Sequence, residues 1–67
     1  MSDQDLITIR EACRRTSLSR TQINTLRNTG RFPSAVTLGT GRIAFVAAEV
    51  EAWISARIAE RDSKVAA

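Results

Sequence analysis

The segment Leu18–Gly30, which reads LSRTQINTLRNTG, decides the fold of this chain. Ser19 and Gln22 stand three residues apart, which is the spacing of a helix N-cap with a capping box. Gly30 follows the last apolar position and can end a helix in the left-handed conformation. The pattern therefore predicts a helix over residues 20–28, stapled at its start by Leu18.

A shorter helix is predicted just upstream of this segment. Thr8 and Glu11 again have the capping-box spacing, in which each side chain satisfies a free backbone amide, and the apolar stripe Ile9, Ala12 and Cys13 follows. Thr16-Ser17 ends the pattern. Two capped helices joined by three or four residues form a helix-turn-helix unit, a geometry that αα-corners without DNA-binding function share.

Downstream of Gly30, the apolar period changes from helical to alternating. Val36 and Leu38 alternate with Thr37, and Ile43 and Phe45 alternate with the small residue Ala44. A four-residue loop, Gly39–Arg42, separates the two runs. This pattern predicts a β-hairpin. Ahead of the first helix, Leu6-Ile7 is expected to form a short edge strand.

The last predicted element is an amphipathic helix from about Ala48 to Arg61. Its apolar stripe is Val50, Trp53, Ile54 and Ile58. Trp53 is expected in the core, since a small domain needs its large apolar area. The predicted fold class is mainly α with a small β-hairpin, a winged helix-turn-helix over residues 6–62, between a flexible N-terminus (1–5) and a frayed C-terminus (63–67).

The charges are distributed unevenly along the chain. The net charge is +3, but residues 12–48 contain six arginines and no acidic residue, so this stretch carries +6. Elsewhere four cations stand against seven acids, which leaves −3. A basic, acid-free region is typical of nucleic-acid binding, whereas an ordinary solvated surface mixes both signs. If four to six arginines contact phosphates, the slope of log affinity against log salt is about −4 to −5.

Within the predicted helix 20–28, Ile23 and Leu26 fix the buried face. Four polar residues oppose it, and Arg20 and Gln22 flank that face near the N-terminus. The four are Thr21, Asn24, Thr25 and Asn28. Asn and Gln pair with adenine, Arg with guanine, and a Thr methyl packs on thymine. The set predicts major-groove reading, although a polar solvent-exposed face has the same composition.

Other residues are candidates for phosphate contacts. Ser19 lies at a helix N-terminus, where free amides favour an anion, although capping alone also explains a serine there. Arg42, between turn glycines, is placed to reach the minor groove or the backbone, or else to lie in solvent. The remaining phosphate candidates are Arg14, Arg15, Arg27 and Arg31.

The composition argues against several functional classes. Histidine is absent and there is a single cysteine, Cys13, so zinc spacings, intramolecular disulfides and His-dependent triads are not available. We therefore expect no enzymatic activity, cofactor or metal. No apolar run approaches a membrane span, and we expect a cytoplasmic, nucleoid-associated protein.

Three motifs in order, Leu18-Ser19-Arg20-Thr21, Gly30-Arg31-Phe32-Pro33 and Glu49–Ile54, resemble the AlpA family of prophage regulators and the wider excisionase and MerR-like winged-helix group. The resemblance covers residues 6–61 and implies a bacterial or phage DNA-binding protein. It places DNA contacts on Ser19, Arg20, Thr21 and Asn24, with the wing at Arg42. Ser17 stands where relatives commonly have glycine.

The leading hypothesis is thus a transcriptional regulator of prophage genes that binds double-stranded DNA, as a homodimer or on tandem sites. An excisionase that bends DNA beside a recombinase or integrase has the same fold and charge. A DNA-packaging subunit is a further alternative. A protein-interaction module docking through the Trp53 helix is the alternative from another class.

Overall fold

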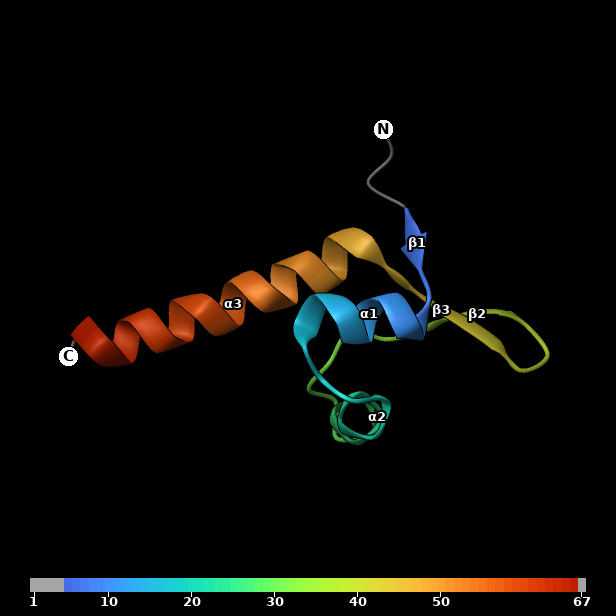
Figure 1. Ribbon diagram of the computed structural model, residues 1–67, viewed down its shortest axis with the longest axis horizontal. Coiled ribbons are helices and arrows are strands. Elements are labelled where there is room, and N and C mark those ends of the chain that lie inside the picture. The colour runs from blue at the N-terminus through green and yellow to red at the C-terminus, as the bar shows by residue number, and fades with distance from the viewer. Residues whose placement is uncertain (1–4, 67) are drawn as a thin grey trace.

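The computed structural model describes residues 5–66 and contains three helices and three strands within that range (Figure 1). The predicted fold class is confirmed: a mainly helical chain with a small antiparallel sheet, consistent with a winged helix-turn-helix. The elements in chain order are β1 (Leu6–Ile7), α1 (Ile9–Thr16), α2 (Arg20–Asn28), β2 (Val36–Gly39), β3 (Arg42–Val46) and α3 (Ala47–Ala66). Of the residues expected to be flexible or frayed, 1–4 and 67 lie outside the described range.

The helix-turn-helix unit has the capped boundaries that its sequence predicts. Thr8 caps α1, because its Oγ1 accepts from the Glu11 amide at 3.1 Å. Ser17 closes α1 in the left-handed conformation, with φ +63°. A residue in that conformation reverses the chain within a very short turn, and α2 begins at Arg20. Ser17 therefore adopts a conformation that glycine takes without penalty and that strains a residue with a side chain.

The sheet joins strand β1 to the hairpin formed by β2 and β3. All neighbouring strands are antiparallel, in the order β1-β3-β2, and Ile7 pairs with Phe45. Asp5, just before β1, also takes part: its carbonyl accepts a hydrogen bond from the Ala47 amide at 2.7 Å. This bond fixes the start of α3 directly after β3, where Ala47 and Ala48 offer no capping side chain.

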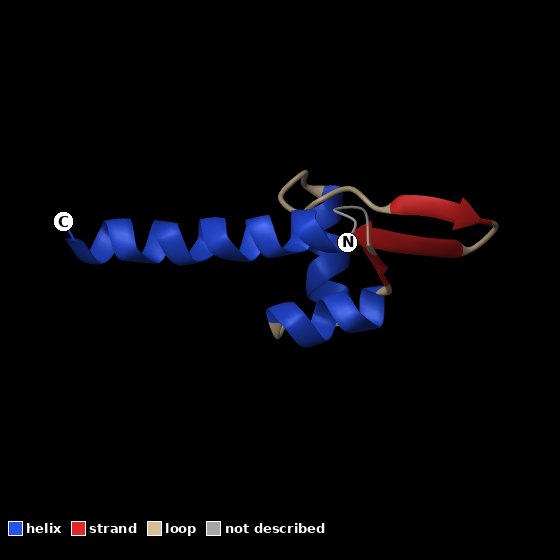
Figure 2. Cartoon of the chain, turned by 90° about the horizontal axis from the view of Figure 1, so that it is seen from above, coloured by secondary structure: helices blue, strands red, loops and turns tan. Residues whose placement is uncertain are grey.

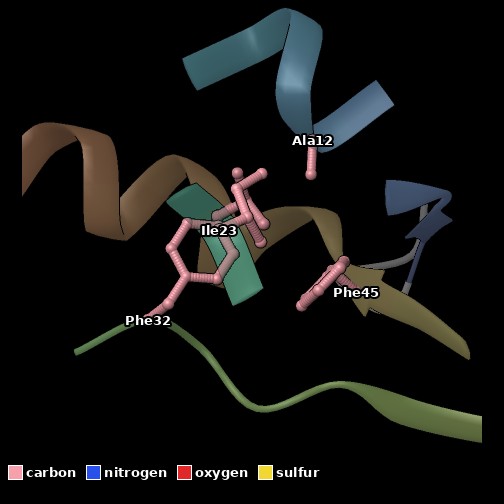
Figure 3. Packing of buried hydrophobic residues seen from close by; sticks show 5 residues of the cluster. Ala12, Ile23, Phe32 and Phe45 are labelled. Atoms are coloured by element: carbon pink, nitrogen blue, oxygen red, sulfur yellow. The ribbon is translucent and has the colours of Figure 1, made fainter. Parts of the chain in front are cut away.

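The core lies where α1, α2, β3 and α3 meet (Figure 3). Ala12, Ile23, Phe45 and Val50 are fully buried. Phe32, from the segment after α2, closes the cluster with its ring edge-on to Phe45, at 5.5 Å between centroids. Edge-to-face pairs add to the stability gained from burial alone.

The hairpin turn is tighter than predicted. Gly39 and Arg42 form the last strand pair, so the loop between β2 and β3 is two residues rather than four. Gly41 has φ +73°, a left-handed conformation that glycine adopts without penalty. The strand register shifts between Thr37 and Gly39, an irregularity in the pairing of β2 with β3.

Helix α3 is longer than predicted and leaves the body of the protein. It runs to Ala66 rather than Arg61, and it extends away from the hairpin (Figure 2). Only its first turns pack on the core, so Val50 is buried while Ile58 is 46% exposed. The predicted packing of Trp53 against the core is confirmed, with 5.0 Å between its ring centroid and that of Phe32, but its side chain is half-buried rather than fully buried.

Candidate nucleic-acid interface

Helix α2 lies at one edge of the molecule, where Figure 1 shows it end-on. A complete capping box fixes its start: Ser19 Oγ accepts from the Gln22 amide at 3.1 Å, and Gln22 Oε1 accepts from the Ser19 amide at 2.9 Å. These two atoms, both on residues predicted to contact DNA, are engaged in holding the helix. Their role in the structure is to set where the following residues point.

The outward side of α2 is polar and open. Thr21, Thr25 and Asn28 are exposed, and Arg20 is exposed at the N-terminal end. The opposite side carries the fully buried Ile23. The helix therefore presents short hydrogen-bonding side chains and threonine methyl groups to solvent, and none of these residues carries a negative charge.

Asn24 differs from the other residues of the predicted reading face. It is half-buried, and its Oδ1 accepts from Arg27 Nη1 at 2.9 Å. The Arg27 guanidinium also lies 5.7 Å from the Phe45 ring centroid, a cation–π distance. Asn24 and Arg27 are thus held as a pair on the flank of α2 that faces the hairpin.

A hollow of about 490 Å³ separates this flank from the hairpin β2–β3, which we call the wing. Three arginines line this α2–wing hollow: Arg20 and Arg27 from α2, and Arg42 from the wing. None of the lining residues is acidic. The others are Thr8, Ile9, Asn24, Gly41 and Ile43. Guanidinium groups donate paired hydrogen bonds to phosphate oxygens, so the chemistry of this lining suits a phosphate.

Sequence reasoning named the three arginines but did not group them. Arg20, Asn24 and Arg27 stand at i, i+4 and i+7, a spacing that places them on one helix flank. That signal was available in the sequence. The approach of Arg42 depends on the tertiary fold, which turns the wing toward α2.

Arg14 and Arg15 were predicted as phosphate contacts, but the structure places both in ion pairs. Arg14 binds the Glu11 carboxylate through Nε at 2.9 Å and Nη2 at 2.6 Å. Arg15 bridges Glu11, at 2.9 Å, and Glu51 of α3, at 3.0 Å. The Arg14 and Arg15 guanidinium groups lower the pKa of Glu11 to about 2, and Glu11 in turn raises the pKa of both arginines.

These ion pairs change two predictions. Glu11 does not complete a capping box with Thr8, because its carboxylate turns to the arginines instead. The second prediction is the charge of +6 for residues 12–48. That count leaves out Glu11, which lies just before the stretch and pairs with Arg14 and Arg15. Of the six arginines in residues 12–48, Arg14 and Arg15 are paired with acids. The other four are Arg20 and Arg27 on α2, Arg31 after it, and Arg42 on the hairpin.

Arg31 lies apart from both the ion pairs of Glu11 and the α2–wing hollow. Its carbonyl accepts from Trp53 Nε1 at 2.7 Å, which ties the segment after α2 to α3. Arg31 shares a hollow with Trp53, Arg57 and Glu60. The Arg57 guanidinium lies 5.6 Å from the centroid of the Trp53 ring. Arg31 therefore does not join the α2–wing hollow.

Within residues 5–66, no helix combines the length and the apolar character that a membrane span requires. Nor do three or more His, Cys, Asp or Glu side chains gather there in a way that would hold a metal ion.

The chain matches the model of a known protein family. The family model described as "Prophage CP4-57 regulatory protein (AlpA)" matches residues 5–58. The match spans every described element except the distal turns of α3. No curated protein and no solved structure matches the chain significantly.

Proposed function

Because this chain belongs to the AlpA family of prophage regulatory proteins, we propose that it is a sequence-specific, double-stranded DNA-binding transcriptional regulator of prophage or mobile-element genes. The observation that carries the proposal is the open polar side of α2, bordered by a hollow lined with three arginines. The proposed role is regulatory and not catalytic, and it needs no cofactor.

In the proposed complex, α2 enters the major groove with its outward side against the base edges. The groove is wide enough for one helix, and its edges carry the donors and acceptors that distinguish base pairs. Asn28 offers an amide suited to adenine. Arg20, at the N-terminal end, lines the α2–wing hollow and joins the backbone contact. Ser19 and Gln22 position this helix through the capping box, and the Gln22 side-chain NH₂ is a further donor.

The α2–wing hollow is the proposed backbone contact. Arg27 is held by Asn24 and by the Phe45 ring, so its guanidinium is already ordered before a phosphate arrives. Arg42 lies at the wing tip, where the two-residue turn extends from the body (Figure 2). In this arrangement residues 39–42 contact the backbone or the minor groove while α2 reads bases. Arg14, Arg15 and Arg31 have secondary roles.

A module of this size contacts DNA over a small area. One such domain buries about 600–1,000 Å² on DNA, which is less than most specific complexes use. We therefore expect homodimers or cooperative binding to tandem sites, with the protein in the cytoplasm on the nucleoid. An excisionase role would add a recombinase partner and DNA bending to the same contacts.

Selection from a random double-stranded DNA library, followed by footprinting, tests the proposal. We expect one enriched motif, and a single site near a promoter would indicate a regulator rather than an excisionase, which would protect several adjacent sites and bend them. Thr21→Ala should relax the preference at one base pair by about 1–3 kcal/mol. Failure to enrich any sequence would refute sequence-specific binding.

A further inference from the structure

A second hollow lies on the flank of α2 that faces away from the wing. Its volume is about 370 Å³ and its walls are mainly carbon. We call it the Leu18–Leu26 hollow. It is lined by Leu18, Thr21, Gln22, Thr25 and Leu26. It shares no lining residue with the α2–wing hollow, so the two flanks of one helix have different chemistry.

The Leu18–Leu26 hollow is built from held side chains. Leu18 and Leu26 are half-buried and pack against the core cluster, so they form a fixed floor. Gln22 is held by its bond to the Ser19 amide. The exposed Thr21 and Thr25 stand one helical turn apart, and threonine, being branched at Cβ, has few rotamers. An apolar group entering here needs little rearrangement of the protein.

The surroundings of this hollow favour DNA as its occupant. Neither α2 nor the lining of this hollow contains an acidic residue, and α2 carries Arg20 and Arg27, so a polyanion is attracted to this helix. The hollow also adjoins the outward side of α2 that we assign to the major groove. The apolar group that DNA displays in the major groove is the C5-methyl of thymine.

We propose that the Leu18–Leu26 hollow receives the C5-methyl group of a thymine, so that A·T pairs beside α2 are recognised by apolar contact rather than by hydrogen bonds alone. This inference rests on the proposed DNA-binding function and adds to it the identity of one recognised group. Thr21 and Thr25 are the specificity-determining residues of this contact.

Replacing each thymine of the selected site, one at a time, by deoxyuridine tests the inference, since this removes the methyl group and leaves every hydrogen-bonding atom in place. At one or two positions we expect affinity to fall about fourfold, the value for burying one aliphatic carbon. All other thymines should tolerate the exchange. Fluorescence anisotropy with labelled duplexes measures these changes.

A substitution in the protein assigns the effect to this hollow. Thr25→Ser removes the side-chain methyl and keeps the hydroxyl. It should reduce the difference in affinity between the thymine and uracil duplexes at the sensitive position, which a double-mutant cycle measures. Thr37→Ser, a matched change on strand β2 outside the hollow, should leave that difference intact. Unchanged circular dichroism spectra would show that both variants fold.

The outcomes separate the two proposals. A selected sequence in which every thymine tolerates uracil would overturn the inference while leaving sequence-specific binding intact. An enriched motif that has no thymine would do the same. Self-association of the free protein that Leu26→Asn abolishes without loss of DNA affinity would assign the hollow to a second copy of the chain and overturn the inference. Failure to select any sequence would remove both.

Discussion

Loss of Arg42 should weaken the salt dependence of DNA binding by a calculable amount. Three arginines line the α2–wing hollow, and each cation that neutralises a phosphate contributes about −0.9 to the slope of log affinity against log salt. The expected slope is about −2.7 for the protein and about −1.8 for Arg42→Ala. Between 50 and 200 mM salt, affinity should thus fall about 40-fold for the protein but about 12-fold for the variant.

Fluorescence anisotropy on the selected operator, repeated at four salt concentrations, gives both slopes. Arg14→Ala is the matched control, because it removes the same charge from a residue that Glu11 already neutralises. We expect the slope of this control to stay near −2.7, on the reasoning that its charge is not free to replace counterions. An equal fall in slope for Arg14→Ala and Arg42→Ala would refute the assignment of phosphate contacts to the hollow.

Three other predictions concern stability, each checked by thermal or urea unfolding followed by circular dichroism. Ser17→Gly should raise the free energy of unfolding by about 0.5–1 kcal/mol, because glycine relieves the left-handed strain at φ +63°; no gain would contradict the strain. Glu11, with a pKa near 2 against an ordinary 4.5, contributes stability that is complete above pH 4.5 and is lost as the pH falls toward 2. Glu11→Gln should therefore flatten the stability profile over that window, and an unchanged profile would show that the ion pairs do not form in solution. Ile23→Val should cost about 0.5–1.5 kcal/mol, whereas Ile58→Val on the exposed part of α3 should stay within about 0.5 kcal/mol; equal costs would contradict the burial of Ile23.

Local signals in the sequence predicted the first half of the fold well. The bounds of α1 and α2 follow from caps and closing residues within a few positions of each helix end, so no tertiary information was needed. The hairpin loop was predicted too long, because Gly39 and Gly41 are both compatible with a turn and only the pairing of Gly39 with Arg42 shows where the ladder ends. The exposure of Ile58 depends on the path of α3, which a periodic pattern does not specify.

The candidate interface was predicted less completely than the fold. The outward exposure of Thr21, Thr25 and Asn28 follows from helical geometry alone. The spacing of Glu11 from Arg14 and Arg15, at i+3 and i+4, already indicated ion pairs. The contribution of Glu51 and the α2–wing hollow arise from elements distant in the sequence, so only the assembled fold reveals them. The Leu18–Leu26 hollow is lined by residues 18–26 alone. The DNA-contact roles themselves stay predictions.

The half-buried Trp53 gives this protein a built-in optical reporter. It is the only tryptophan of the chain, it rests on Phe32 under the Arg57 guanidinium, and it lines neither hollow of α2. Its emission should therefore follow the docking of α3 on the body and change little when α2 meets a duplex. Melting of the fold can then be read with the operator bound, without attaching a dye near the nucleotides.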